Sequence, residues 1–423
     1  MMPHWVTWTT KQLFVYPNEY IYWSVQIVMY PFMTGLVAGA FVLSSLYHVF
    51  GIKRLKDIAR FSLVFSFALL LVAPLPLLCH LEQPLRALNV FLTPHFTSAI
   101  AAFGVVFTAY AAIVACEIWL VYRPHFVHVA ASLREVKNRT FAQQLSWLLF
   151  SVLTLGATDV SEGALARDER AIRGLSGLGI PVACFLHGYA GFIFGSVKAN
   201  ALWMTPLMPV IFIVSAIVSG IALCMLTYIV AMELRKLQAR RRASAATSAG
   251  EEIAGVEWNV IRMTAGYLLF FMIFAFSLEL LDLVFRGYTA VKTWDALRSV
   301  IYGKDFTNIF VLQYGLGALL PIILLALPRL TMRRTVVILV LVLFGVFMMR
   351  WNVVIGGQSF SLTLAGYMQY TVPVIPHDFE TFKEGALGAL MVGVLPFIIF
   401  AVMTKVLPVF GSGGSHEGGL AEA

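Results

Sequence analysis

The sequence contains few charged residues. Asp, Glu, Lys and Arg make up 12% of its 423 residues, and hydrophobic residues make up 60%. An average soluble domain is about a quarter charged, and a soluble chain of this length needs more polar surface than these residues supply. The composition therefore excludes a soluble globular fold. It predicts an all-α integral membrane protein that presents apolar side chains to lipid.

The sequence also has few cysteines and no cysteine cluster. No C-x-x-C pair occurs, and each thiol stands alone in or beside an apolar stretch: Cys79, Cys116, Cys184 and Cys224. Iron–sulfur clusters and structural zinc sites need several closely spaced ligands. We therefore expect buried free thiols, with neither an iron–sulfur cluster nor a metal site in this chain.

A histidine pair that could hold haem b is missing as well. Haem inside a helical bundle needs axial ligands that face each other across helices. His48 falls near one end of the first apolar run, whereas His187 falls nearer the opposite end of the fourth. We expect no haem, so electrons must arrive from a partner protein.

Long apolar runs are abundant. A membrane helix needs about 20 mostly apolar residues, and nine runs meet this length: 22–50, 61–79, 98–122, 175–197, 206–232, 261–285, 309–327, 336–352 and 385–407. A tenth run, 145–156, is too short to cross and resembles an interfacial piece. The first 18 residues lack the pattern of a cleaved signal peptide.

Basic residues fix the predicted topology. Lys and Arg cluster after the first, third, fifth and seventh runs, at 53–60, 123–139, 235–242 and 329–334. Cytoplasmic loops carry such an excess, and all four clusters share one side only if 145–156 does not cross. This predicts nine helices in a prokaryotic cytoplasmic membrane, with the N-terminus periplasmic and the C-terminus cytoplasmic. The net charge of +8 is thereby explained without nucleic-acid binding.

The predicted organisation has two membrane halves. Residues 20–232 form the first half and 260–410 the second, and 141–174 form a cytoplasmic-side insertion in the first. A polar cytoplasmic linker, 233–259, joins the halves. Residues 1–19 form an outer segment, and the Gly-rich tail 411–423 is expected to be disordered.

Three stretches resemble the NrfD family, the membrane subunits of polysulfide-reductase-type complexes. Residues 80–89 read H-L-E-Q-P-L-R-A-L-N and are followed by T-P-H-F-T-S at 93–98, similar to the family signature H-L-G-R-P-L-R … P-x-x-S-P. Glu82 and Gln83 stand where the family has Gly-Arg, and Ala99 replaces the final Pro. Two further stretches agree, at 180–206 and 350–358, so the resemblance extends over nearly the whole chain.

The resemblance implies two four-helix bundles with an accessory ninth helix. It also implies a quinone (menaquinone or ubiquinone) that exchanges electrons with an iron–sulfur subunit on the outer face. That subunit usually connects to a molybdopterin catalytic subunit or a multihaem cytochrome. The chain would then supply a quinone site and an anchor, with no catalytic residue of its own.

A quinone pocket needs an apolar slot and a few hydrogen-bonding side chains. The outer end of the first predicted bundle offers nine candidates: Gln26, Tyr30, His80, Arg86, Asn89, His95, His187, Tyr189 and Trp203. Tyr30 and Trp203 are either ligands or interfacial belt aromatics. His80 and Arg86 either contact quinone or brace the loop and dock the partner. His187 is the strongest candidate because a polar group in mid-membrane is costly, and our hypothesis is that it or Tyr30 bonds a quinone carbonyl.

A second set of ionisable residues lies in the second half. Glu279 and Asp282 share one face of the sixth predicted helix, and Arg350 lies toward the outer end of the eighth. We expect Arg350 to pair with one of these acids, because an isolated buried charge is costly. The pair either joins two helices or, with Glu117 on the third helix, belongs to a proton path. A secondary transporter or a passive anchor remain rival interpretations of the chain.

Overall fold

The computed structural model describes residues 6–8, 21–95, 97–245, 256–289, 293–360 and 367–410. Within these ranges, nine helices are long and apolar enough to cross a membrane. The predicted all-α membrane architecture is confirmed, and the chain is a multi-pass membrane protein. The predicted tail 411–423, most of segment 1–19 and the central part of the 233–259 linker lie outside the described residues.

The nine spans lie close to the predicted runs. Several begin in an ordinary helical cap: the Ser24 side chain, for example, accepts a bond from the Gln26 amide at the start of the first helix. The spans are α1 (Val25–His48), α2 (Lys56–Val72) with η1 (Lys53–Leu55) and α3 (Leu75–His80), α5 (Ala99–Glu135), α7 (Glu162–Gly195), α8 (Met208–Ala245), α9 (Trp258–Tyr288), η4 (Thr307–Leu319) with α11 (Leu320–Ala326), α12 (Met332–Trp351) with η5 (Asn352–Gly356), and α14 (Ala386–Val406).

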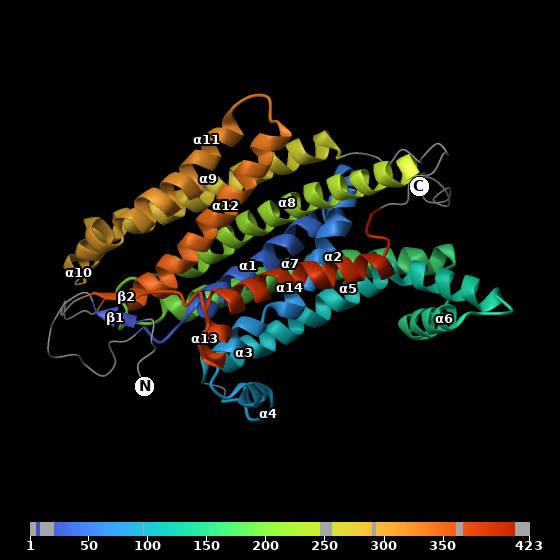
Figure 1. Ribbon diagram of the computed structural model, residues 1–423, viewed down its shortest axis with the longest axis horizontal. Coiled ribbons are helices and arrows are strands. Elements are labelled where there is room, and N and C mark those ends of the chain that lie inside the picture. Colours follow the sequence, from blue (N-terminus) through green and yellow to red (C-terminus); the bar gives the residue numbers. More distant parts are fainter. Residues whose placement is uncertain are drawn as a thin grey trace.

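The spans form two groups that meet where α1 packs against α8 (Figure 1). Helices α1, α2, α5 and α7 pack together, as do α8, α9, η4/α11 and α12, while α14 packs against α2 and α1. The most apolar window of α1 is 89% buried and that of α9 only 17%. Helix α1 therefore lies at the centre, and α9 turns most of its surface outward.

Glycines allow the two groups to approach closely. A Cβ atom on Gly220 of α8 would meet the backbone of Gly39 on α1, and the reverse substitution would meet Gly220 and Ala216. Gly317 and Gly345 form a similar contact between η4 and α12. Small residues at such crossings let helix backbones touch, which is a common way for membrane helices to associate.

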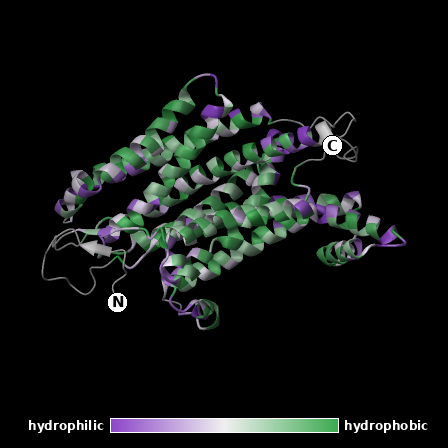
Figure 2. Ribbon diagram, in the orientation of Figure 1, coloured by the Kyte–Doolittle hydropathy of each residue, from purple (hydrophilic) through white to green (hydrophobic). Residues whose placement is uncertain are grey.

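The two ends of the helical body differ in their content of basic residues. We call the end where α1 and α5 begin and α7 ends the Trp23 end, on the left in Figure 1. The opposite helix ends carry the four Lys and Arg clusters, and we call them the basic end. Figure 2 shows hydrophobic residues along the middle of the helices and hydrophilic residues gathered toward their ends. The four clusters lie at matching helix ends, as the nine-span count requires.

The segment between the third and fourth spans differs from its prediction. Helix α5 runs to Glu135, beyond the predicted end at 122, and α7 begins at Glu162, inside the predicted 141–174 insertion. Arg123 can lie within α5 because Asp168 of α7 accepts two bonds from it, at 2.8 and 2.6 Å. Only α6 (Phe141–Leu153) remains between them, with 13 residues, so the tenth apolar run forms a short helix.

Five short helical elements lie at the Trp23 end: η2 (Pro84–Leu88), α4 (Asn89–Leu92), α10 (Trp294–Ser299), η3 (Val300–Lys304) and α13 (Phe379–Glu384). Strand β1 (Val6–Trp8) pairs antiparallel with β2 (Met368–Tyr370), with Thr7 opposite Gln369. The two strands were not predicted from the sequence. Three-residue strands leave no usable alternation in a sequence.

Candidate functional site

Polar side chains from three separate segments meet at the Trp23 end. The Nδ1 atom of His80, at the end of α3, lies 3.4 Å from Ser24 Oγ and 3.4 Å from a carboxylate oxygen of Glu384. The side-chain amide of Gln26 donates to the backbone carbonyl of Lys383. We call Ser24, Gln26, His80, Lys383 and Glu384 the Trp23-end cluster. It joins the start of α1 to the ends of α3 and α13.

One buried atom of this cluster has no partner. Gln26 is fully buried, and its Oε1 makes no hydrogen bond within the described part of the chain. An unsatisfied buried acceptor typically costs about 1–3 kcal/mol. Such an atom is a natural acceptor for a hydroxyl or N–H group of a ligand.

Residues far along the chain fix the start of α1. The Tyr370 hydroxyl accepts a bond from the Val25 amide at 2.9 Å, and the side-chain Oε1 of Gln358 accepts bonds from the backbone amides of Tyr22 and Trp23 at 3.2 and 3.1 Å. Burial raises the pKa of Tyr370, so the hydroxyl stays protonated at neutral pH. The third family-like stretch therefore positions the first helix.

Aromatic rings lie beside the cluster. Tyr30, one turn along α1 from Gln26, packs edge-on against Phe103 with ring centroids 5.7 Å apart. Phe103 in turn lies 6.4 Å from the Tyr189 ring of α7. Tyr30 and Tyr189 thus contact the same ring from two helices, and they form an aromatic wall in the part of the first bundle near the Trp23 end.

Three predicted site residues lie apart from this cluster. Arg86, Asn89 and His95 belong to the 81–98 loop, and the Arg86 and Asn89 side chains are largely exposed. The His95 ring bonds the Thr97 hydroxyl at 2.8 Å. Among the described residues, no hydrogen bond or ion pair joins these three to the Trp23-end cluster, and helix α4 projects away from the helical body in Figure 1.

Trp203 has a structural setting that the sequence did not reveal. Its side chain is 6% exposed, its Nε1 donates to the Val353 carbonyl, and its ring stacks on Trp23 at 5.1 Å. A belt aromatic would face lipid, so that interpretation is wrong for this residue. Trp203 instead joins the loop after α7 to η5 by this hydrogen bond, and to the segment before α1 by stacking on Trp23.

His187 joins the two bundles. It is fully buried, its Nε2 lies 3.0 Å from Arg350 Nη2, and its Nδ1 lies 3.4 Å from Thr34 Oγ1. Its ring also stacks on Phe212 of α8 at 5.6 Å. Because both ring nitrogens already face protein groups, the structure gives His187 other partners than the quinone carbonyl of our hypothesis.

The expected pairing of Arg350 with an acid is wrong. Its guanidinium bonds Ser215 Oγ at 2.8 Å, besides His187, and lies 3.8 Å from the centre of the Phe212 ring. Asp282 pairs instead with Arg286, at 2.8 Å, and Glu279 accepts a bond from Gln313 at 2.7 Å. Within the described ranges, the cation is held by neutral acceptors and an aromatic face.

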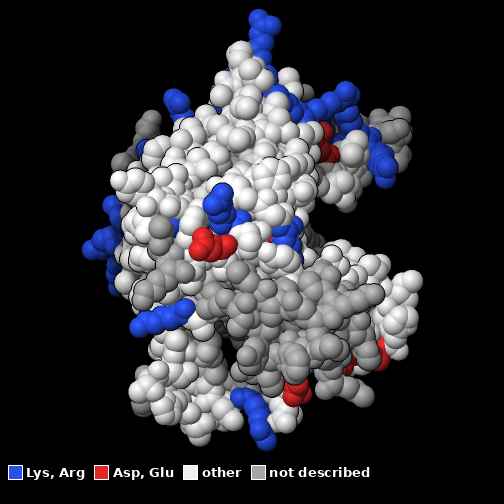
Figure 3. All heavy atoms as spheres, turned by 90° about the vertical axis from the view of Figure 1, so that its left-hand side faces the viewer, with Lys and Arg blue, Asp and Glu red and all other residues white. Residues whose placement is uncertain are grey.

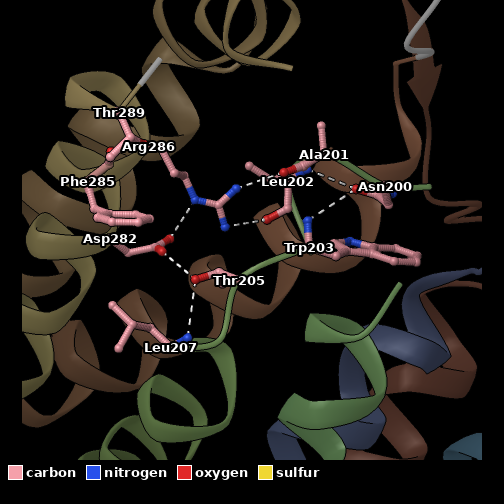
Figure 4. Close-up of polar contacts among 10 residues, drawn as sticks. All are labelled: Asn200, Ala201, Leu202, Trp203, Thr205, Leu207, Asp282, Phe285, Arg286 and Thr289. Atoms are coloured by element: carbon pink, nitrogen blue, oxygen red, sulfur yellow. Dashed lines mark hydrogen bonds and ion pairs between the residues drawn. The ribbon is translucent and has the colours of Figure 1, made fainter. Parts of the chain in front are cut away.

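Asp282 and Arg286 brace the loop between α7 and α8 (Figure 4). Arg286 donates to the carbonyls of Ala201 and Leu202, while Asp282 accepts a 2.6 Å bond from the Thr205 hydroxyl. Arg286 was not predicted, although an acid and an arginine four residues apart on a helix are a readable signal. The pair fixes the turn that carries Trp203.

Glu279 lies between two small cavities. One of about 100 Å³ is lined by Glu279, Gln313, Asn352 and Tyr314, and one of about 40 Å³ also contains Glu279 and Gln313. Gln313 Oε1 accepts a 2.7 Å bond from Asn352, which continues the polar chain. Glu117 lies in the other bundle, where its carboxylate accepts a 2.6 Å bond from Ser176. The structure thus brings Glu279 and Asp282 to one cavity and leaves Glu117 outside it.

A comparison with protein families decides the identity. The family model described as polysulphide reductase, NrfD, matches residues 16–362. The chain belongs to the NrfD family. A selenate reductase subunit of Mesobacillus selenatarsenatis is similar to it, with 25% identity over 405 residues, 93% of this chain and 87% of that protein. A putative dimethyl sulfoxide reductase membrane subunit of Halobacterium salinarum shares 27% identity over 361 residues, 84% and 71% of the two chains.

The NrfD match covers eight of the nine spans that the structure describes and ends before α13 and α14. Lys383 and Glu384 therefore lie beyond the matched stretch, although they contact Gln26 and His80. Among the described residues, no group of three or more His, Cys, Asp or Glu side chains is arranged to hold a metal ion. Ser24, Lys383 and Glu384 were not predicted, because nothing in their spacing along the chain connects them to His80.

Proposed function

We propose that this NrfD protein is the quinone-reactive membrane subunit of an oxidoreductase complex. It binds a quinone or quinol at the Trp23 end and exchanges electrons with an iron–sulfur subunit. Family membership and the names of both relatives, each a subunit of a reductase, support a place in such a complex. The observation that carries the quinone site is the unpartnered Gln26 Oε1 beside the His80–Glu384 contact.

The Trp23-end cluster has the chemistry that a quinone head group requires. Gln26 Oε1 can accept a bond from a quinol hydroxyl, which would satisfy its only unbonded polar atom. Tyr30, Phe103 and Tyr189 supply apolar ring surface one turn away. A site of this kind combines an apolar slot with a few fixed hydrogen-bonding groups.

Residues of the Trp23-end cluster can also bind the protons that a quinone reaction consumes or releases. A quinone takes up two protons when it gains two electrons, and a quinol releases two protons when it loses them. Both contacts of His80 use Nδ1, so its Nε2 remains for a ligand, and Glu384 lies 3.4 Å away with 13% of its side chain exposed. An imidazole can donate or accept a proton at a ring nitrogen, which suits this role. We assign the transfer between ligand and surface to His80 and Glu384.

The remaining parts of the complex follow from this assignment. The partner iron–sulfur subunit docks at the Trp23 end and connects to a molybdopterin enzyme or a multihaem cytochrome. From the positive-inside rule we assign the basic end to the cytoplasm of a prokaryotic cell and the Trp23 end to the outside. In Figure 3, which faces the Trp23 end, the basic and acidic side chains of the described residues are scattered over the face, and some lie side by side. Such a surface supports docking by shape rather than by one strong field.

The test is quinol oxidation by the purified complex. We expect Gln26→Leu and His80→Gln each to lower quinol turnover about tenfold to a hundredfold, since each removes a group that bonds or protonates the ligand. Gln144→Leu and His128→Gln are matched controls, because both side chains are exposed at the basic end. Unchanged turnover in both cluster variants, with the complex intact, would contradict the quinone site.

A proton path through the second half is a second part of this proposal. Glu279 contacts two cavities and the Gln313–Asn352 chain, so water and side chains could pass a proton along it. We expect Glu279→Gln in proteoliposomes to abolish a quinol-driven pH change while quinol oxidation continues. A pH change of wild-type size in that variant would exclude Glu279 from the path.

A further inference from the structure

Helix α6 exposes a continuous apolar face. Phe141, Leu145, Leu148 and Val152 are 87%, 58%, 53% and 61% exposed, and Leu149 beside them is 45% exposed. Their spacing of four, three and four residues places them on one side of a helix. A face of this kind on a soluble surface would promote aggregation, so something must cover it.

The other side of α6 is firmly attached to α5. Trp119 Nε1 donates to the Leu153 carbonyl at 2.8 Å, and the Phe150 ring lies 5.8 Å from His125 and 6.2 Å from Phe126. Arg123 bonds the Ala157 carbonyl at 3.0 Å in the turn that follows α6. The apolar face therefore points outward in a fixed orientation.

Basic residues flank this face. The segment 134–139, which comprises the last two residues of α5 and the turn into α6, carries Arg134, Lys137 and Arg139 and one acid, Glu135. Three positive charges and one negative charge give it a net charge of +2. Arg139 lies over the Trp147 ring of α6 at 4.8 Å. Figure 2 shows a hydrophilic turn beside a hydrophobic α6, away from the Trp23 end.

We propose that α6 is an interfacial anchor that binds the anionic phospholipid surface at the basic end. Its aliphatic side chains enter the acyl boundary, and the basic turn contacts lipid phosphates. Thirteen residues span about 20 Å as a helix, which is too short to cross a bilayer but suits a helix lying at one surface.

The test places a photoreactive benzoylphenylalanine at Leu148 of the full chain in vesicles of phosphatidylcholine with phosphatidylglycerol. We expect lipid adducts at about the yield obtained from Phe397, which is exposed on the transmembrane helix α14, and none from Glu162 at the start of α7. Position Leu145 provides a second probe if the Leu148 variant is poorly produced. Adducts with another protein subunit, or no adducts at either position, would overturn the proposal.

Charge is tested separately. We expect phosphatidylglycerol to be enriched among the adducts, and Arg134→Gln and Lys137→Gln each to reduce this enrichment about fivefold, as one basic residue near an anionic surface does. Arg298→Gln at the Trp23 end is the matched control. Equal labelling of both lipids in the unaltered chain would overturn the assignment of an anionic surface. These outcomes do not depend on the quinone proposal.

Discussion

Arg350 Nη2 of α12 lies 3.0 Å from His187 Nε2 of α7, and this contact joins the two halves of the protein. Ser215 and the Phe212 ring of α8 complete the surroundings of the guanidinium. The Arg350 Nε atom has no hydrogen-bond partner within the described residues. A buried cation that makes no direct ion pair with a carboxylate depends strongly on each neutral acceptor that it has.

The first prediction concerns this dependence. His187→Leu removes one of the few acceptors of Arg350, so we expect it to lower the free energy of unfolding by about 1–3 kcal/mol. In the Arg350→Met background the same substitution should cost much less, because the cation is gone. Thermal or denaturant unfolding of the four purified chains in detergent measures the difference.

Arg298→Met provides the control for this cycle, because Arg298 is exposed on α10. Its effect and that of His187→Leu should simply add. Equal costs of His187→Leu with and without Arg350 would show that the contact carries no coupling energy.

A second prediction concerns the crossing of α1 and α8. Gly220→Ala would place a Cβ against the backbone of Gly39, so we expect a loss of about 1–3 kcal/mol in unfolding free energy. At Gly266 on α9 a Cβ meets nothing within 4 Å. Gly266→Ala should therefore leave stability unchanged or raise it by up to about 1 kcal/mol. Equal effects of the two substitutions would mean that the close crossing is absent in the membrane.

A third prediction concerns the loop between α7 and α8. Arg286→Met removes the donors that hold the Ala201 and Leu202 carbonyls. We expect hydrogen exchange of the backbone amides in 200–204 to become about tenfold faster, since losing roughly 1.4 kcal/mol of local stability has that effect. Arg286→Lys, which keeps a cation beside Asp282, should fall between wild type and Arg286→Met. No change in exchange would refute the bracing role.

A fourth prediction concerns the start of α1. Tyr370→Phe removes the acceptor of the Val25 amide and should cost about 1 kcal/mol of stability. Burial raises the Tyr370 pKa above its ordinary value of 10.0, so its neutral form is favoured in the folded chain. The contribution of Tyr370 to the free energy of unfolding is complete below its ordinary pKa of 10.0 and is lost as the pH rises through its pKa in the folded chain. Tyr302→Phe, at an exposed ring, is the control; an equal cost there would argue against the capping bond.

Much of the fold follows from sequence patterns alone. Apolar runs near 20 residues located the nine spans, and the position of Lys and Arg correctly kept 145–156 out of the count. The end of α5 was missed by 13 residues, because Arg123 looked like a helix-ending charge. Only the folded chain shows that Asp168, 45 residues further on, neutralises it.

Side-chain partners were harder to predict than helices. Glu279, Asp282 and Arg350 were placed on the correct spans, but hydropathy does not reveal how each helix is rotated about its axis. Arg350 therefore met His187 and Ser215 instead of an acid. The Trp23-end cluster was half predicted, with Gln26 and His80 named and Glu384 missed, because it unites residues more than 300 positions apart.

Helices α13 and α14 have an evolutionary and practical consequence. They lie outside the stretch that defines the family, yet α13 supplies both residues that bond Gln26 and His80 from the far side. Grafting residues 16–362 onto the C-terminal part of a relative would therefore rebuild one wall of the cluster from foreign sequence. The quinone site that we propose would then have Lys383 and Glu384 replaced by whatever the relative carries at these positions.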